Sequence, residues 1–357
     1  MNDKIKDIIV TLVFLFTIIS LFLINVIKKD TDISIAERRK LATMPELTIK
    51  SLFDGTYTKK LDSYVTDQFV ERDTFRKIKI NIELSTKGEY NNLYMYNDYI
   101  IEETYPLNKE SVINVTNKIN DIKRTYLNET NNIYYSIVPD KNYFVNDDNL
   151  KLDYDELKNI MNSNLDIKYI DIFNELSLED YYKTDTHWRE ERLFKVVNKL
   201  SKEMNFNITN NYSFKRISDF NGTYSSRIVR KDIKDEIYIL DNVNDINVYN
   251  YETNGYEKVY DLIKLNSLDK YNVYLSGSVS LLKIESMNTD STKDLIVFRD
   301  SYGSSLIPLM MNGYKSITVV DTRYISPSML SNYIDFNNKD ILFLYSTLLI
   351  NDSFTLK

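Results

Sequence analysis

The sequence predicts an α/β domain built around a parallel sheet and preceded by one membrane-spanning helix. Short apolar segments alternate with segments of helical periodicity, which is typical of a buried parallel sheet with helices between its strands. Residues 8–27 form an uncharged apolar run near the N-terminus. The chain has 357 residues, of which 43% are hydrophobic and 27% charged, so it is long and apolar enough to form one large or two ordinary globular domains.

Composition excludes several classes of function. The chain has no cysteine, which excludes disulfides, thiol catalysis and cysteine-ligated metals. A single histidine excludes a multi-histidine metal centre. We find no Walker-type loop or dinucleotide fingerprint, and therefore expect neither metal nor cofactor. The net charge of −7 argues against nucleic-acid binding, which needs a basic surface.

The apolar run from Ile8 to Ile27 is long enough to cross a hydrocarbon core of about 30 Å. It ends in Lys28-Lys29-Asp30 without a small-residue cleavage site, which favours an uncleaved anchor over a signal peptide. Basic residues follow the run as well as precede it, but long domains are exported largely regardless of such charges. We therefore expect a single-pass protein, with residues 1–7 as a cytoplasmic tail, residues 8–27 as the transmembrane anchor, and residues 28–357 outside the cell membrane.

Residues 28–84 are expected to form a polar stalk followed by an amphipathic helical segment, and 85–357 to form the main domain. The helical segment carries an apolar stripe of Leu52, Leu61, Val65, Phe69, Phe75, Ile78 and Ile82. In the main domain we predict strands at 133–138, 167–173, 295–298, 317–320 and 341–345, and an amphipathic helix at 189–204. Residues 207–272 are polar and rich in Tyr and Asn, and are predicted to be a β-rich insertion that leaves the sheet.

The one histidine, His187, stands two residues after Asp185. A carboxylate at this spacing can accept a hydrogen bond from the imidazole, fix its tautomer and stabilise its protonated form, as in hydrolytic triads. The plain alternative is a surface histidine beside an ordinary aspartate.

A serine follows the predicted strand at 295–298. Ser301 lies in the turn between that strand and a predicted helix at 304–311 that ends at Gly313. Strand–turn–helix is where α/β hydrolytic enzymes place a nucleophilic serine, and backbone N–H groups at the helix start can stabilise an oxyanion. The alternative is that Ser301 or Ser304 only caps the helix.

Several blocks along the chain resemble the family named for its DHHW motif, which is related to the alginate O-acetylation proteins of the SGNH-hydrolase-like superfamily. The blocks are Glu37-Arg38-Arg39-Lys40-Leu41 with Pro45, Asp67-Gln68-Phe69-Val70-Glu71-Arg72, Val138-Pro139-Asp140-Lys141, Asp185-Thr186-His187-Trp188, Phe220-Asn221-Gly222-Thr223-Tyr224, Asp300-Ser301-Tyr302-Gly303 and Asp321-Thr322-Arg323-Tyr324. Thr186 stands where the naming motif has its first histidine.

The resemblance implies an SGNH-hydrolase-like α/β/α sandwich with a permuted chain order, in which Asp and His precede Ser. It implies Ser301 as nucleophile, His187 as general base and Asp185 as the residue that orients the histidine. Triads are recognised by role and geometry, so chain order is no objection.

Other residues are weaker candidates for the site. Gly222, Gly277, Asn221 and the backbone N–H of Tyr302 are candidate oxyanion donors, although turn glycines are the plainer interpretation. Lys141 is a candidate lining residue, and the only tryptophan, Trp188, is expected either to stack on a sugar or to pack beneath the histidine loop. The remaining candidates, expected to form ordinary ion pairs with Asp300 or Asp321, are Arg299 and Arg323.

The leading hypothesis is therefore a membrane-anchored, extracytoplasmic O-acetyltransferase-like protein that acts on a cell-surface or exported polysaccharide through an acetyl-serine intermediate. The resemblance also implies a multi-spanning membrane-bound O-acyltransferase as the acetyl donor. Two alternatives stay open: a carbohydrate acetyl esterase with the same triad, and a non-catalytic glycan-binding scaffold of a polysaccharide-modification complex.

Overall fold

The structure is a computed structural model, and it describes residues 3–34, 37, 39–145, 149–208, 212–230, 232–241, 243, 245–287 and 289–357. Arg38 and part of the predicted insertion lie outside these residues. The chain forms two compact units. One comprises residues 1–90 with 226–229, and the other residues 91–225 with 230–357.

The first unit begins with α1 (Asp3–Ile27), a helix of 25 residues with no buried side chain. It is long and apolar enough to span a membrane. The predicted amphipathic segment is three helices rather than one, because left-handed backbone at Gly55 and Glu71 interrupts it. The remaining elements of this unit are β1 (Ile33–Ser34), β2 (Arg39–Lys40), α2 (Ile49–Phe53), α3 (Thr56–Gln68), α4 (Arg72–Lys87) and β3 (Glu89–Tyr90).

The predicted apolar stripe of this segment is largely exposed. Its exposed members are Leu52, Val65, Phe75, Ile78 and Ile82.

Charged side chains connect the motif block that begins at Glu37 with the block that begins at Asp67. Arg39 donates to both carboxylate oxygens of Asp67 at 2.7 and 2.5 Å, and Arg72 pairs with Glu37 at 2.5 Å. The hydrogen bond from Arg39 lowers the pKa of Asp67 to about 2.

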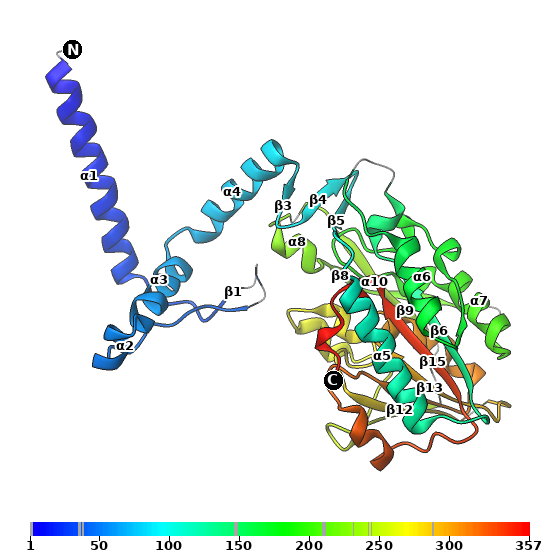
Figure 1. Ribbon diagram of the computed structural model, residues 1–357. Coiled ribbons are helices and arrows are strands. Elements are labelled where there is room, and N and C mark those ends of the chain that lie inside the picture. The colour runs from blue at the N-terminus through cyan, green and yellow to red at the C-terminus, as the bar shows by residue number, and fades with distance from the viewer. Residues whose placement is uncertain are drawn as a thin grey trace. The chain divides into compact units, whose positions relative to one another are not determined.

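An eight-stranded sheet forms the centre of the second unit, in the order β11-β10-β12-β14-β13-β15-β6-β7. Figure 1 labels β12, β13, β15 and β6 of this sheet. Its strands are β6 (Asn132–Val138), β7 (Lys168–Tyr169), β10 (Ile246–Asn250), β11 (Gly255–Glu257), β12 (Leu281–Ser286), β13 (Asp294–Arg299), β14 (Ser316–Val320) and β15 (Asp340–Ser346). Strands β14, β13, β15, β6 and β7 are parallel, while β12, β10 and β11 continue the sheet antiparallel. The prediction of a parallel sheet is therefore right for its core and incomplete at one side.

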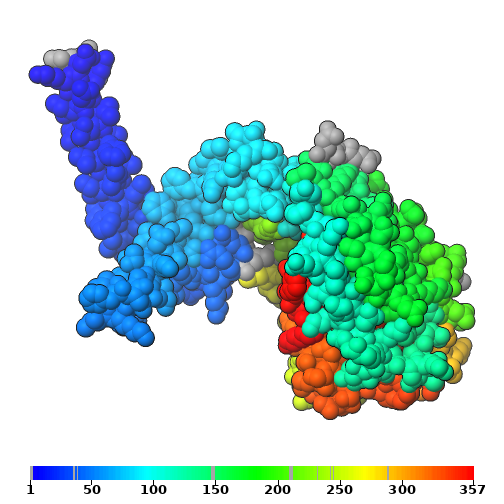
Figure 2. Space-filling model, viewed as in Figure 1, coloured from blue at the N-terminus to red at the C-terminus, as the bar shows by residue number. Residues whose placement is uncertain are grey.

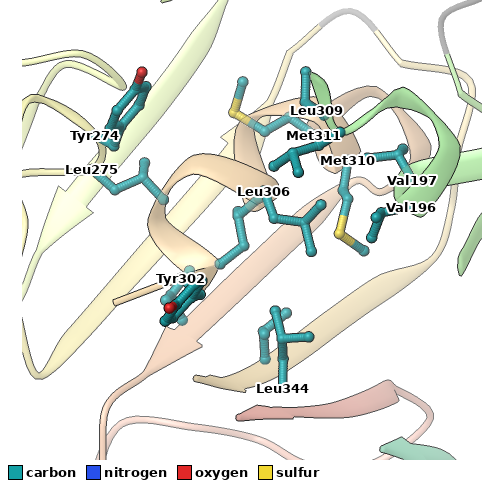
Figure 3. Close-up of a cluster of buried hydrophobic side chains, with 14 of the residues drawn as sticks. Val196, Val197, Tyr274, Leu275, Tyr302, Leu306, Leu309, Met310, Met311 and Leu344 are labelled. Carbon is teal, nitrogen blue, oxygen red and sulfur yellow. The ribbon is translucent and has the colours of Figure 1, made fainter. Parts of the chain in front are cut away.

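Alternate side chains of the central strands enter two hydrophobic clusters, one on each face, as the two-residue period of a strand requires. On one face Leu295 and Val297 pack with α7 (Phe194–Met204). Val196 and Val197 of this helix lie near Met310 in Figure 3. On the other face Ile296 belongs to the hydrophobic cluster that it forms with side chains of α5 (Lys109–Tyr126) and α6 (Tyr154–Asn164). The C-terminal segment, red in Figure 2, lies against α5, where Ser111 donates to the carbonyl of Ile350.

Several predicted elements differ in extent. Strand β7 is only two residues long, and a 3-10 helix follows at Phe173–Glu175. The helix predicted at 189–204 begins at Phe194. The helix after Ser301 is a short α9 (Gly303–Leu306) that continues as a 3-10 helix over Ile307–Gly313, where Pro308 removes a backbone donor.

The segment predicted as an insertion is β-rich but does not leave the sheet entirely. Strands β8 (Phe214–Phe220) and β9 (Asp235–Leu240) form a separate two-stranded sheet, whereas β10 and β11 join the central one. The other elements are β4 (Leu93–Tyr96), β5 (Tyr99–Glu102), α8 (Thr223–Arg227) and α10 (Thr347–Asn351).

Candidate active site

The carboxyl end of β13 holds Ser301 in a turn that a buried aspartate shapes. Asp300 accepts a hydrogen bond from the backbone N–H of Tyr302 at 3.0 Å and another from that of Ser346, at the end of β15, at 2.8 Å. The carboxylate thus ties together the ends of two adjacent parallel strands. This leaves the side chain of Ser301 partly exposed, while Asp300 beside it is buried.

Ser301, His187 and Asp185 form one hydrogen-bonded chain. The Oγ of Ser301 lies 2.8 Å from Nε2 of His187, and Nδ1 of the same ring lies 2.6 Å from Oδ1 of Asp185. An ionised carboxylate only accepts hydrogen bonds, so the ring proton belongs on Nδ1. Nε2 is then the acceptor for the serine hydroxyl, which is the arrangement a general base needs.

The Asp185 carboxylate is buried and saturated with donors. Its second oxygen accepts hydrogen bonds from the N–H of Thr223 at 2.7 Å and from the hydroxyl of Thr223 at 2.8 Å. Burial alone raises the pKa of Asp185, but the charge and hydrogen bond of His187 and the two bonds from Thr223 outweigh it. The pKa therefore lies well below the usual range, and Asp185 stays ionised beside the histidine.

Gly222 is the point where two loops meet, and it is not a free oxyanion donor. A Cβ at this position would lie 2.3 Å from Cβ of Asp185 and 2.4 Å from the carbonyl oxygen of Thr184. The N–H of Gly222 donates to the Thr184 hydroxyl at 2.9 Å. Only glycine allows this approach, which brings Thr223 within reach of Asp185. Asn221, which precedes it, is exposed.

The imidazole of His187 stacks on the ring of Tyr271, with centroids 3.7 Å apart and planes 8° from parallel. The hydroxyl of Tyr271 is 2.8 Å from Oγ of Ser305 and donates to the carbonyl of Ser301 at 3.3 Å. Tyr271 therefore braces both ends of the Ser301–His187 pair. Sequence analysis missed it, because one tyrosine among 29 gives no signal.

Tyr302 and Trp188 have packing roles that differ from some of the predicted ones. The N–H of Tyr302 is taken by Asp300, so it is not available as an oxyanion donor, and its ring is buried. Trp188 is fully buried, and its indole N–H lies 3.0 Å from the carbonyl of Tyr302 and 3.0 Å from Oγ of Ser305. Of the two expectations for Trp188, packing beneath the histidine loop is correct and sugar stacking is wrong.

The two arginines meet on Asp321 rather than on Asp300. Arg299 is fully buried, 3.3 Å from the Asp321 carboxylate, and also donates to the carbonyl of Gly277 at 3.0 Å. Arg323 binds the same carboxylate through two nitrogens, at 2.9 and 2.6 Å. The N–H of Gly277 donates to the carbonyl of Tyr274 at 3.0 Å, so Gly277 is a turn residue, with a φ of 78°.

Lys141 is buried rather than lining the site. Its ammonium donates to the carbonyls of Ile100, Tyr182 and Lys183, and lies 4.8 Å from the ring centroid of Tyr224. Burial lowers the pKa of Lys141 to about 7. Lys141 thus fastens the start of the loop that carries Asp185 and His187. Among the described residues, no three His, Cys, Asp or Glu side chains gather as a metal site would require.

No protein-family model and no curated protein matches the sequence. Solved structures do match. A DHHW family protein from Eubacterium siraeum superposes with a TM-score of 0.61 at 18% identity, over 73% of this chain and 93% of that one. The chain has the fold of a DHHW family protein. The structure of Bacillus cereus PatB1 with a sulfonyl adduct matches with a TM-score of 0.56 at 16% identity, over 72% and 95% of the two chains. The O-acetyltransferase domain of Pseudomonas putida AlgJ matches more weakly, with a TM-score of 0.44 at 9% identity over 73% of this chain and 92% of that one.

Proposed function

We propose that this chain is a membrane-anchored, extracytoplasmic serine O-acetyltransferase of the SGNH-hydrolase-like kind, which moves acetyl groups to a cell-surface or exported polysaccharide. The observation that carries the proposal is the chain of two short hydrogen bonds from Ser301 through His187 to Asp185. Each partner is in the state that nucleophilic catalysis needs: the serine is accessible, the histidine is oriented, and the carboxylate is ionised.

In the first half-reaction, Oγ of Ser301 attacks the carbonyl carbon of an acetyl donor while Nε2 of His187 takes the hydroxyl proton. The tetrahedral oxyanion collapses, the bond to the donor oxygen breaks, and His187 returns the proton to the departing alcohol. Acetyl-Ser301 remains. The N–H groups of Tyr302, Gly222 and Gly277 are engaged elsewhere, which favours the N–H of Ser301 itself as an oxyanion donor.

In the second half-reaction, His187 takes a proton from a sugar hydroxyl, whose oxygen attacks the acetyl carbon. Collapse releases the acetylated sugar and restores the Ser301 hydroxyl with the proton held by His187. Asp185 stabilises the imidazolium in both halves. Water in place of the sugar hydroxyl would make the same site an esterase.

An acetyl group and a polysaccharide are proposed because the sequence blocks resemble the DHHW family, which is related to the alginate O-acetylation proteins. The same resemblance supports a multi-spanning membrane-bound O-acyltransferase as donor, since acetyl groups activated in the cytoplasm must first cross the membrane. Helix α1 supports the placement at the membrane. A sulfonyl adduct on PatB1, which shares the fold, supports testing this site with a sulfonyl fluoride.

The test is intact-mass spectrometry of the full chain in phospholipid nanodiscs after incubation with an activated acetyl ester. We expect one added acetyl group on the wild type and none on Ser301→Ala. Ser304→Ala is the matched control, because it removes a buried hydroxyl three residues away that makes no hydrogen bond to any described residue. Equal labelling of wild type and Ser301→Ala would refute the proposal. Turnover to free acetate despite added glycans would assign the site to an esterase.

A further inference from the structure

One face of the antiparallel side of the sheet carries a row of tyrosine and polar side chains. Tyr256 of β11 lies opposite Tyr249 of β10. Tyr249 also lies opposite Lys283 of β12, and Lys283 lies opposite Thr318 of β14. Residues in register on adjacent strands point to the same face of a sheet. The four side chains therefore form one row across four strands, and all are at least partly exposed.

A second row lies beside the first, on the same face. Asn247, Glu285, Ser316 and Asp294 are in register across β10, β12, β14 and β13. On strands β12 and β14 the residues between these positions, such as Ile284 and Ile317, are buried in the hydrophobic cluster of the opposite face. The sheet thus has one packed face and one polar, aromatic face in this region.

Further tyrosines extend the aromatic part of this surface. Tyr251 meets Tyr249 with ring centroids 5.0 Å apart, and Tyr333 meets Tyr251 at 5.5 Å. Tyr256 meets Tyr249 at 5.3 Å and is itself 72% exposed. We call these four rings, Tyr249, Tyr251, Tyr256 and Tyr333, the tyrosine face.

The tyrosine face borders a groove of about 570 Å³, lined by Tyr251, Tyr333 and polar side chains of β12, β13 and β14. The loops beside these strands complete its lining with Met287, Lys315, Ile334, Asp335 and Lys339. This volume lies within the range of small-ligand sites. Four of its six charged side chains pair within the groove: Lys283 lies 2.7 Å from Glu285, and Lys339 lies 2.8 Å from Asp294. The other two, Lys315 and Asp335, are of opposite sign, so the charges of the groove balance. Paired charges favour an uncharged ligand that offers many hydroxyl groups over a charged one.

We propose that the tyrosine face and its groove bind a neutral polysaccharide, as a site separate from Ser301. Pyranose rings with equatorial hydroxyls present flat C–H faces that stack on exposed aromatic rings, while their edges hydrogen-bond to carboxylate, ammonium and hydroxyl groups such as those of Glu285, Lys283 and Ser316. The proposal takes its ligand class from the proposed function.

The location of the groove relative to Ser301 fits a role in the proposed acetyl transfer. Asp294 begins β13 and Ser301 follows its end, so groove and nucleophile lie at opposite ends of one strand of about 20 Å. A polymer held at the groove keeps its neighbouring sugars at a high local concentration around Ser301.

The test is isothermal titration calorimetry of the full chain, carrying Ser301→Ala and held in sugar-free phospholipid nanodiscs, with cellohexaose and chitohexaose as probes. We expect binding of at least one of them. Tyr256→Ala should weaken it by about three- to tenfold, the value of one stacked ring. Phe354→Ala, which removes an aromatic side chain that is 60% exposed on another element, should leave it unchanged.

Binding of neither oligosaccharide, or equal binding by Tyr256→Ala and Phe354→Ala, would overturn the proposal. So would a change in oligomeric state caused by Tyr256→Ala, since it would assign the face to contacts between copies of this chain. Acetyl-ester labelling of Ser301 is measured separately on Tyr256→Ala with Ser301 intact. Normal labelling without glycan binding defeats this inference alone, whereas absent labelling with normal binding defeats the proposed function alone.

Discussion

Replacing Gly222 by alanine tests how the Asp185–His187 pair is held, at a residue that takes no part in the chemistry. The new Cβ would lie 2.3 Å from Cβ of Asp185, whereas ordinary contacts begin near 3.4 Å. The two loops must therefore separate by about 1.1 Å, in a region where both the Thr184 backbone and the Asp185 side chain are buried.

A displacement of this size breaks the alignment of the site. The hydrogen bond between Asp185 and His187 is 2.6 Å long, and moving the carboxylate by about 1 Å takes it beyond hydrogen-bond distance. Misplacement of about 1 Å lowers catalytic rates by about 10²-fold. Overpacking of this kind lowers the free energy of unfolding by about 1–3 kcal/mol, which a typical domain tolerates.

The assay is the second-order rate of Ser301 modification by a sulfonyl fluoride, followed by intact mass, with thermal unfolding measured on the same samples. Gly255→Ala is the matched control, because its Cβ would meet nothing nearer than 3.7 Å. We expect about 10²-fold slower modification for Gly222→Ala and an unchanged rate for Gly255→Ala. A folded Gly222→Ala protein that reacts at the wild-type rate would refute the account of how Asp185 is positioned.

Three further changes probe the same network. Asp185→Asn should slow modification of Ser301 by about 10⁴-fold in the same assay, because an amide favours the wrong imidazole tautomer; a loss below tenfold would contradict the assigned role. Thr223→Val should slow it on the order of tenfold through loss of one charge-assisted hydrogen bond, and an unchanged rate would show that the backbone N–H suffices. Burial lowers the pKa of Lys141 to about 7, so above that pH the folded chain binds fewer protons at Lys141 than the unfolded chain does. The free energy of unfolding should therefore rise from pH 7 to about pH 9, by at most about 1.4 kcal/mol per pH unit. Lys141→Met should lose that slope in urea unfolding, and an equal slope in both proteins would contradict the pKa.

The sequence predicted which three side chains meet, because the chain offers one histidine and two motif blocks that place Asp185 and Ser301. It could not predict what holds them. The role of Gly222 depends on the close packing of two segments 37 residues apart, where an added Cβ would lie 2.3 Å from Cβ of Asp185, and that of Tyr271 on stacking against a histidine 84 residues away. Both are properties of tertiary packing, which one sequence does not display.

In the central sheet, too, the sequence predicted some strands and missed others. Strands β13, β14 and β15 were predicted from their apolar runs, since buried parallel strands are apolar on both faces. Strand β11 pairs with β10, and β10 pairs with β12; the pairing of β10 with β12 is a non-local choice that periodicity alone does not reveal. Lys141 was predicted to line the site for a related reason: its place after a strand was correct, but its burial depends on the carbonyls of Ile100 and Tyr182.

In the proposed reaction, acetyl passes through Ser301 to a sugar hydroxyl. Its most direct test is to load the full chain in nanodiscs with ¹³C-labelled acetyl, remove the donor, add cellohexaose or chitohexaose, and follow the label by mass spectrometry. We predict that label leaves Ser301 faster with oligosaccharide than with buffer alone and is recovered as acetylated oligosaccharide. Label recovered only as acetate, at a rate independent of the oligosaccharide, or label that never resides on Ser301, would contradict the account.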